Sequence, residues 1–501
     1  MSLVLNIERG QSGATLQRQL YAQIRDNIVS ATFHPGMSLP SSRRLADDLG
    51  VSRNTVMLAY EWLINEGYIQ TQPGVGTFVT KSLPENCIAV AAEPDETIHN
   101  ALAAGDVRRP RIIFRGERHR IVEKGPGRPS IDFWYGSPNW RHFPAKAWRQ
   151  LLIDNLSRTS TNLSQYANPS GNLELRKAIA QHLGANRAIR AVPEQIIITA
   201  GAQEGLNLIC RLLVEPGVRV VVENPCYGGA ARAFQSYGAA LLPVEVDNYG
   251  VDVTALENAQ ANFAYVTPSH QFPTGVTLSN DRRMRLLNWA ANAGAYILED
   301  DYDSDFRYDG PPLAALAGLD RNGCVIYLGT FSKSVGAGLR LGFLMVPEHL
   351  VETMLTIKSL ANYGHPWLDQ IVMAEFIVGG GYSRHLRRIR HLYQTARDTL
   401  LASLERHFGK SLYISGKYSG MHLMWTLPPD LAPAERFAAR ALAQDVGVYP
   451  LNEVGAIDFS GQRQANCIVL GYSSLSPDQI ETGIERVADA CFGRKPRRRA
   501  S

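Results

Sequence analysis

The chain has 501 residues, of which 45% are hydrophobic and 20% are charged, and this composition excludes both disorder throughout and a small disulfide-stapled fold. The net charge of +4 is too small to indicate a nucleic-acid binder by itself, so any DNA contact must come from locally placed side chains. The cysteines form no Cys-x-x-Cys pair and give no support to a zinc or redox motif. Because no leader-like start and no stretch of about 18 apolar residues occurs, we expect a cytoplasmic protein without a membrane span.

The first predicted element is an amphipathic helix over residues 15–33. It carries apolar residues at every fourth position, namely Leu16, Leu20, Ile24 and Ile28. A second helix should begin with Ser41 or Ser42 as its cap and stop at Gly50. Two helices in close succession, the second of them short, are the beginning of a helix-turn-helix pattern.

A third helix is predicted to begin at Ser52. One face of it should carry the apolar residues Val56, Tyr60, Leu63 and Ile64. The polar residues Arg53, Asn54 and Thr55 fall in its first turn, which is the part of a recognition helix that enters a major groove. Two short strands around Pro73–Gly76 should then form a glycine-rich wing that can approach a phosphate backbone closely.

These segments, LPSSRRLADDLGVSRNTV and the final GxGTFV, resemble the winged-helix domain of GntR-type transcription regulators. The resemblance implies a winged helix-turn-helix domain over residues 12–80 that binds double-stranded DNA. It implies DNA contacts by Arg43, Arg44, Ser52, Arg53, Asn54, Thr55 and Gly76. Arg53 and Asn54 suit base edges, whereas Arg43 and Arg44 suit phosphates. The alternative is a winged helix that binds another protein, with the same polar residues as a solvated surface.

Residues 81–130 have the composition of a linker, with several prolines and no sustained period. From residue 131 to 493, helical patterns alternate with short apolar runs that read as strands buried on both faces. These runs are IIIT (196–199), VRVVVE (218–223), FAYVT (263–267), AYILED (295–300), CVIYLGT (324–330) and LGFLMV (341–346). The pattern predicts an α/β domain with a mainly parallel sheet, followed by a basic tail over 494–501.

Two strand ends in this domain carry candidate chemistry. After IIIT, a turn of small residues leads into a helix that opens at Ala202 and Gln203, where free N–H groups favour an anion such as phosphate. After AYILED come four aspartates that would repel one another unless a cation or a proton is shared, at positions 300, 301, 303 and 305. A calcium loop is conceivable, but the glycine of the EF-hand pattern is absent, and we predict no metal site.

A third strand end, GTFSKSVGAGLRLGF, places Lys333 among hydroxyls with Arg340 seven residues later. Such a lysine can serve as an ordinary anion cradle. It can also be an amine whose pKa is lowered by the neighbouring cation and which forms a Schiff base. An anion site, a carboxylate and an imine-forming lysine are together what pyridoxal phosphate requires.

The large domain resembles fold-type I aminotransferases. Joined to a GntR-type winged helix, it resembles the MocR subfamily of regulators over nearly the whole chain. The resemblance implies pyridoxal phosphate as cofactor and a homodimer. Lys333 would hold the cofactor as the internal aldimine, Asp300 would pair with the pyridine nitrogen, and Tyr302 would contact the phenolic oxygen. Tyr227 would stack on the ring. The phosphate would be held by Ala202, Gln203, Thr330, Ser332, Arg340 and the Tyr166 of a neighbouring subunit.

Two departures from the aminotransferase pattern bear on the ligand. In SHQFPTG, Phe272 stands where the family has an asparagine, and His270 or Gln271 could substitute for it. The arginine that grips a substrate α-carboxylate is replaced by Asn466, with Arg463 as the nearest candidate. The place of a second acid-binding arginine reads Gly228–Gly229. Loss of the bidentate cation weakens the expectation of an ordinary amino-acid substrate.

The first functional hypothesis is therefore a transcription regulator whose aminotransferase-like domain senses pyridoxal phosphate, or an amino acid or amine. The alternative is an active aminotransferase with an accessory winged helix. Because the winged helix is intact and the carboxylate arginine is missing, we favour a regulator that is not an enzyme. A pure interaction protein is disfavoured, since each buried charge among Lys333, Asp300 and Arg340 would be costly without a ligand.

Overall fold

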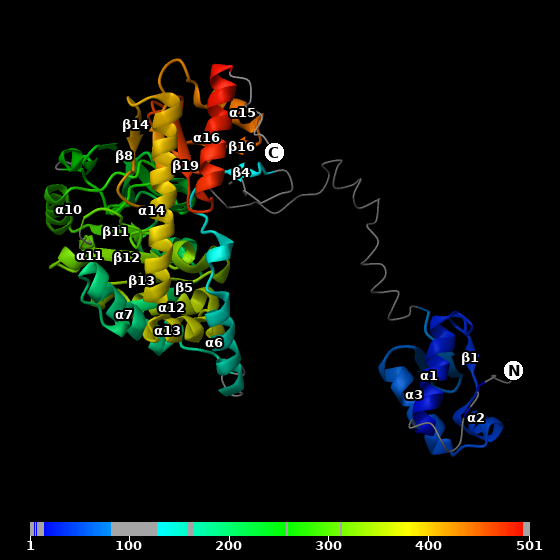
Figure 1. Cartoon of the computed structure of the whole chain (residues 1–501). Coiled ribbons are helices and arrows are strands. Elements are labelled where there is room, and N and C mark those ends of the chain that lie inside the picture. Colours follow the sequence, from blue (N-terminus) through cyan, green and yellow to red (C-terminus); the bar gives the residue numbers. More distant parts are fainter. Residues whose placement is uncertain are drawn as a thin grey trace. The chain divides into compact units, whose positions relative to one another are not determined.

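The computed structural model describes residues 5, 7, 15–81, 128–158, 165–256, 259–310 and 313–493. The chain divides into two compact units between residues 112 and 113, which falls inside the predicted linker. Most of that linker and the predicted basic tail over 494–501 lie outside the described residues. Each unit is described by itself below and is drawn in Figure 1.

The first unit consists of three helices and a three-stranded antiparallel sheet. The helices are α1 (Leu16–Val29), α2 (Ser42–Leu49) and α3 (Arg53–Asn65). The sheet has the order β1 (Ser38–Leu39), β3 (Gly76–Val79), β2 (Ile69–Gln72). Ser41 caps α2, Gly50 ends it in the left-handed conformation, and Ser52 caps α3 by accepting a hydrogen bond from the N–H of Thr55. The helix-turn-helix and wing predicted from the sequence are therefore present.

Two details of this unit differ from the prediction. Helix α1 ends at Val29 rather than near residue 33, because the chain turns back so that Phe33 enters the core and its N–H donates to the carbonyl of Asn27. Ile64 is 40% exposed, and Ala59 is buried instead. At about 100° per residue, Ile64 lies some 80° around the helix from Val56, at the rim of the apolar face.

The second unit is built on the eight-stranded sheet β5-β13-β12-β11-β10-β6-β8-β9. Its strands are β5 (Ile196–Thr199), β6 (Arg219–Asn224), β8 (Ala240–Asp247), β9 (Gly250–Val251), β10 (Phe263–Val266), β11 (Tyr296–Asp301), β12 (Val325–Thr330) and β13 (Gly342–Met345). The β12–β11–β10–β6–β8 run is parallel, and β13 and β9 pair antiparallel. All six apolar runs identified in the sequence are strands of this sheet, and their residues are almost entirely buried.

Helices cover both faces of the sheet, as its apolar strands require. The helices that precede, connect or follow its strands are α6 (Ala145–Arg158), α7 (Leu173–Arg187), α8 (Ala202–Leu213), α9 (Gly228–Ser236), α10 (Asn280–Ala293), α11 (Leu316–Leu319), α12 (Val351–Asn362) and α13 (Trp367–Val378). Side chains of α8, α9 and α12 share one buried cluster with the sheet, and side chains of α10 share another. The fold is therefore the expected fold-type I α/β arrangement.

A smaller layer follows in the chain. Its sheet has the order β14 (Tyr413–Ser415), β15 (His422–Thr426), β19 (Cys467–Gly471), β17 (Tyr449–Pro450). The long helix α14 (Gly381–Phe408, yellow) runs beside α16 (Pro477–Phe492, red) in Figure 1, and α15 (Ala434–Leu442) packs on α16. Short strand pairs join β16 (Val446–Gly447) to β4 (Ile131–Asp132) and β18 (Ala456–Ile457) to β7 (Cys226–Tyr227).

Parallel pairing determines where the site lies. The register matches Val266 with Glu299 and Asp301 with Gly329, so the carboxyl ends of β10, β11 and β12 meet at one edge of the sheet. Polar residues that follow these strands are thereby brought together. Within the described ranges, no helix combines the length and apolar character needed to cross a membrane.

Candidate functional site

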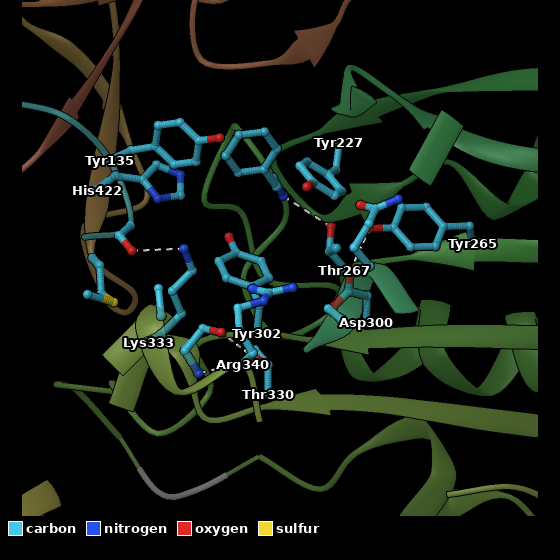
Figure 2. Close-up of a pocket in the computed structure, with 17 residues that line it drawn as sticks. Tyr135, Tyr227, Tyr265, Thr267, Asp300, Tyr302, Thr330, Lys333, Arg340 and His422 are labelled. Atoms are coloured by element: carbon cyan, nitrogen blue, oxygen red, sulfur yellow. Dashed lines mark hydrogen bonds between the residues drawn. The ribbon is translucent and has the colours of Figure 1, made fainter. Parts of the chain in front are cut away.

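The edge formed by β10, β11 and β12 opens into a pocket of about 220 Å³ (Figure 2). Its lining consists of Tyr135, Gly136, Ala202, Gln203, Tyr227, Tyr265, Thr267, Phe272, Asp300, Tyr302, Thr330, Ser332, Lys333, Ala337, Arg340, Met421 and His422. Every residue predicted to bind the cofactor is among them except Tyr166. The structure thus gathers residues that are up to 287 positions apart in the sequence, from Tyr135 to His422.

One end of the pocket can hold an anion. Helix α8 begins there after Gly201, so the N–H groups of Ala202 and Gln203 point out of its first turn. The Arg340 guanidinium donates from Nη2 to the carbonyl of Ala200 at 2.8 Å. Gly201 permits this approach, because a Cβ there would lie 2.9 Å from Arg340 Nη2 and its φ is +77°. A cation, a helix N-terminus and the nearby hydroxyl of Thr330 form an oxyanion cradle.

The lining also holds a buried carboxylate with one oxygen that has no partner among the described residues. Asp300 Oδ2 accepts a hydrogen bond from the Tyr265 hydroxyl at 2.7 Å, whereas Oδ1 is buried without a partner among the described residues. Burial raises the pKa of Asp300 to about 7, and the hydrogen bond from Tyr265 opposes this increase. The carboxyl can therefore change its charge near neutral pH, and Oδ1 is available to a donor placed in the pocket.

Lys333 extends into the pocket from a short π-turn, η5 (Ser332–Gly336), that follows β12. Its Nζ donates to the carbonyl of Gly136 at 2.8 Å, which Figure 2 shows as a dashed line. A Cβ on Gly136 would lie 2.5 Å from that nitrogen, and the φ of Gly136 is +64°, so a larger residue there would be strained and would displace the amine from this position. Burial lowers the pKa of Lys333, and Asp303 and Asp300 oppose this. The cause predicted from the sequence was wrong. Burial, and not the charge of Arg340, lowers the pKa of Lys333, and the Arg340 guanidinium donates to the carbonyl of Ala200 instead.

Tyr302 is held from behind by His270. The Tyr302 hydroxyl donates to the His270 carbonyl at 2.9 Å, and His270 Nδ1 lies 3.1 Å from that hydroxyl and 2.8 Å from Asp303 Oδ2. His270, Asp303 and His422 are residue types that bind metal ions, and their ligand atoms lie within 4.8 Å of one another. However, His270 Nδ1 contacts Asp303, and His422 Nε2 contacts the carbonyl of Pro273 at 3.1 Å. This geometry favours a hydrogen-bonded support for Tyr302.

The position of the family asparagine is filled by the buried ring of Phe272, which packs on Tyr135 and Tyr227 with centroid distances of 5.1 and 5.8 Å. Neither of the residues considered as substitutes lines the pocket. Gln271 donates to the carbonyls of Pro225 and Phe272, and His270 acts through Tyr302. The pocket is consequently more apolar at this point than in the aminotransferase pattern.

The four aspartates after β11 do not share one cation. Asp301 pairs with Arg187 at 2.8 Å, Asp303 contacts His270, and Asp305 accepts from the Tyr382 hydroxyl at 2.9 Å. Each carboxylate therefore has its own partner, and their mutual repulsion is relieved separately. This leaves Asp300 as the aspartate of the series that lines the pocket.

Arg463, the nearest candidate for binding a substrate carboxylate, does not line the pocket. The prediction that it could take this role was therefore wrong. Its guanidinium is used by Glu245 Oε2 at 3.0 Å and by the carbonyls of Asn224 and Val246 at 3.1 and 2.7 Å. Among the residues that line the pocket, Arg340 is the one arginine. The described residues thus offer no second guanidinium to an α-carboxylate.

Tyr166 also lies outside the pocket. The residue is 89% exposed, and its ring lies beside that of Tyr363, with centroids 5.4 Å apart and planes inclined by 54°. The predicted role of Tyr166 concerned the phosphate of a neighbouring subunit, so its place on the surface of one chain leaves that prediction untested.

Several lining residues were not found from the sequence. Tyr265 and Thr267 belong to β10 and its end, and a hydroxyl in an otherwise apolar strand was a signal for them. Thr267 donates from Oγ1 to Glu223 Oε2 at 2.6 Å, and burial raises the pKa of Glu223 to about 7. Tyr135, Gly136 and His422 come from distant segments and carried no local signal.

The first unit presents a second candidate site, a hollow of about 1160 Å³ between α2, α3 and the wing. Of the predicted DNA contacts, Arg44, Arg53 and Gly76 line it. Arg43 and Asn54 are exposed at the starts of α2 and α3. The hydroxyls of Ser52 and Thr55 lie 2.8 Å apart. These two residues therefore form the N-terminal cap of α3 in addition to their predicted contact with DNA. A groove with arginines at helix starts suits a phosphate backbone and base edges.

Both units match known families. Residues 16–79 match the family described as Bacterial regulatory proteins, gntR family, and residues 134–487 match Aminotransferase class I and II. The HTH-type transcriptional regulator YhdI of Bacillus subtilis is 35% identical over 482 residues, which cover 96% of each chain. The regulatory protein MocR of Rhizobium meliloti is 33% identical over 476 residues, covering 95% of this chain and 93% of its own. The kynurenine aminotransferase of Pyrococcus horikoshii has a similar structure, with a TM-score of 0.66, 27% identity, and coverage of 81% of this chain and 96% of that chain.

Proposed function

The chain belongs to the gntR family of HTH-type transcriptional regulators, in the MocR-type group that continues into an aminotransferase class I and II domain. On this premise we propose that it binds pyridoxal phosphate. We further propose that it regulates transcription in response to that cofactor or to an amine that reacts with it. The observation that carries the proposal is the unpartnered buried oxygen of Asp300 in the same pocket as an oxyanion cradle. A ligand with a protonated ring nitrogen and a phosphate satisfies both.

The cradle fits a phosphate ester in charge and in hydrogen bonding. Ala202 and Gln203 offer N–H groups at a helix N-terminus, Thr330 and Ser332 offer hydroxyls, and Arg340 offers a permanent positive charge. Charge-assisted hydrogen bonds of this kind are about twice as strong as neutral ones. These residues would hold the phosphate of the cofactor.

Asp300 and Lys333 fit the two reactive parts of the cofactor. A carboxylate against the ring nitrogen keeps that nitrogen protonated, and a lysine whose pKa is lowered by burial has more of its amine in the free, nucleophilic form. Pyridoxal phosphate, when bound, supplies an electron-withdrawing ring and an aldehyde that captures amines. Tyr302, held by His270, would orient the phenolic oxygen, and Tyr227 would pack on the ring.

A sensor accounts for the pocket better than an efficient aminotransferase does. Arg340 belongs to the phosphate cradle, and no other arginine lines the pocket among the described residues. A substrate carboxylate would then lack its bidentate partner, which weakens ground-state and transition-state binding alike. A slow transamination half-reaction is the second candidate function, because Lys333 and the aminotransferase fold are both present.

The first unit would carry out the regulation by binding DNA. Arg53 and Asn54 at the start of α3 would read base edges, and Arg43 and Arg44 at α2 would bind phosphates. We further infer a homodimer, in which the exposed Tyr166 would reach the cofactor phosphate of the partner subunit and two winged helices would bind paired half-sites. A bacterial regulator of this type works in the cytoplasm, where the chromosome lies.

Borohydride reduction tests the cofactor assignment. Full-length protein incubated with pyridoxal phosphate should show visible absorption, and borohydride should fix the cofactor to Lys333, identified by peptide mass. The Lys333→Ala variant should lose both signals, whereas Lys146→Ala, which removes an exposed lysine, should retain them. Equal labelling of a different lysine in folded Lys333→Ala protein would refute the assignment.

Measuring how tightly the protein binds the DNA upstream of its own gene, with and without candidate ligands, identifies the effector. Operator affinity should be compared with and without pyridoxal phosphate, followed by titration of amino acids and amines into the loaded protein. A change on loading identifies the cofactor as the signal. A change only on addition of an amine identifies the amine, because a ligand shifts such an equilibrium only by its differential affinity.

A further inference from the structure

A second cavity of about 150 Å³ lies behind the aspartates that follow β11. Its lining consists of Asn186, Arg187, Ser269, His270, Ser304, Asp305, Arg307, Gly310, Leu313, Arg390 and Ser419. None of these residues lines the cofactor pocket. The cavity is therefore a separate space, formed by the end of α7, the segment after β11, helix α14 and the loop before β15.

The lining is strongly basic. It holds three arginines and one carboxylate, that of Asp305. Arg187 is ion-paired with Asp301 at 2.8 Å, and Arg390 donates from Nε to the backbone carbonyl of Asp305 at 2.9 Å. Neither Arg307 nor Arg390 forms an ion pair with a carboxylate of the described chain. Since Asp305 accepts from Tyr382 and lies 3.6 Å from His182, its charge is already shared elsewhere.

Besides Arg187 Nε, which is ion-paired with Asp301, and His270 Nε2, two donors of this lining are buried without a hydrogen-bond partner among the described residues, namely Arg307 Nε and Ser419 Oγ. The Ser419 side chain belongs to a residue that is only 5% exposed. A buried donor left unsatisfied is unfavourable, and native structures leave few of them. An acceptor with several oxygens in the cavity would satisfy both donors at once.

We propose that this cavity is a binding site for a compact oxyanion, of the size and charge of inorganic phosphate or a small dicarboxylate. Guanidinium groups match the geometry of oxyanions, and a serine hydroxyl adds a directional donor. Arg307, which forms no ion pair among the described residues, disfavours a cation or a protonated amine. The volume excludes a ligand as large as a nucleotide. This site goes beyond the proposed function and does not depend on it.

The position of the site gives it a meaning in a regulator. Arg187 lies in the wall of the cavity and also holds Asp301, the neighbour of Asp300 in the chain. An anion that shares Arg187 weakens its hold on Asp301, so the cavity and the cofactor pocket would be energetically linked. Binding of an acidic metabolite in the cavity would then change the affinity of the cofactor pocket, and cofactor binding would change the affinity for the anion by the same factor.

Calorimetric titration of the full chain tests the proposal. The protein should carry Arg340→Gln, so that the cofactor cradle has lost its cation, and the ionic strength should be held constant with chloride. Inorganic phosphate and succinate are titrated separately. We expect saturable binding of at least one of them, and the tighter one identifies the source of the oxyanion. Absence of saturable binding of both would overturn the proposal.

Second substitutions in the same background locate the binding. Arg307→Gln should raise the Kd at least tenfold and Ser419→Ala several-fold, whereas Arg321→Gln, which removes an exposed arginine, should leave it unchanged. Binding that is insensitive to Arg307 and Ser419 would place the anion elsewhere and refute the site. If Arg307→Gln does not fold, Arg390→Gln and Ser419→Ala decide the outcome, with circular dichroism confirming their structure.

Discussion

Replacing Asp300 by asparagine tests the electrostatics of the pocket quantitatively. Burial raises the pKa of Asp300 to about 7, whereas an unfolded aspartate titrates near ~3.9. Between these values the folded chain retains a proton that the unfolded chain releases, so the free energy of unfolding falls as the pH rises. At about 1.4 kcal/mol per pH unit over about three units, the loss is roughly 4 kcal/mol and is complete above pH 7.

Asparagine has no proton to release, so Asp300→Asn should remove this part of the pH dependence. Scanning calorimetry of the full chain, without added cofactor, should give similar unfolding temperatures for wild type and variant near or below pH 4, where the unfolded aspartate also keeps its proton. At pH 8 the transition of the second unit should lie higher in the variant. Added pyridoxal phosphate should reverse the order, because a protonated ring nitrogen stabilises the charged carboxylate of the wild type.

Asp430→Asn is the matched control, since it removes an exposed carboxylate of the same unit. It should not change the pH dependence. A difference between wild type and Asp300→Asn that stays constant from pH 5 to pH 8 would refute the reasoning. Glu223 also titrates near neutral pH because burial raises its pKa to about 7, so a residual slope in the variant is expected.

Three further predictions concern both units. Arg53→Ala should cost about 1 to 3 kcal/mol at the operator and little on random DNA, whereas Arg43→Ala should weaken both and reduce the salt dependence, as measured by fluorescence anisotropy. Ser52→Ala should destabilise the first unit by about 1 kcal/mol in urea unfolding, because the cap of α3 is lost. Gly136→Ala should abolish borohydride labelling of Lys333 while leaving DNA binding intact, because the new Cβ would occupy the space of the amine.

Each of these predictions has its contrary outcome. Equal effects of the two arginine substitutions on specific and random duplexes would show that α3 is not the recognition helix. An unchanged urea midpoint in Ser52→Ala would mean that another group caps α3. Undiminished labelling in Gly136→Ala would show that the Lys333 amine reaches the cofactor by a different path.

Site residues could be predicted from the sequence where the residues that form the signal are close together in the chain. The strand-to-helix turn at Ala202, the aspartates after β11 and the lysine after β12 are each read within about a dozen residues, and the parallel register brings them together. The caps Ser41 and Ser52 are equally local, because a cap bonds to residues two or three positions away.

Contacts between distant residues could not be predicted in this way. Tyr265 reaches Asp300 from 35 positions earlier, and Arg463 is taken up by Glu245, which is 218 positions away. The cause of the lowered pKa of Lys333 was also missed. Proximity in the sequence suggested Arg340, but side-chain direction and burial are set by the tertiary fold.

The core of the first unit has an evolutionary consequence. Its buried cluster, from Leu20 to Val79, is composed entirely of side chains from that unit, and α2 and α3 carry their own side-chain caps. Among the described residues, the core of the first unit therefore depends on no side chain of the second, and we expect the proposed DNA-binding surface and the proposed ligand pocket to vary separately. Mutations that retune one need not be compensated in the other, so lineages can recombine an old operator with a new signal. Chimeric regulators assembled within the 81–130 segment should retain the specificity of each parent, and the same independence explains how one architecture can come to serve many different genes.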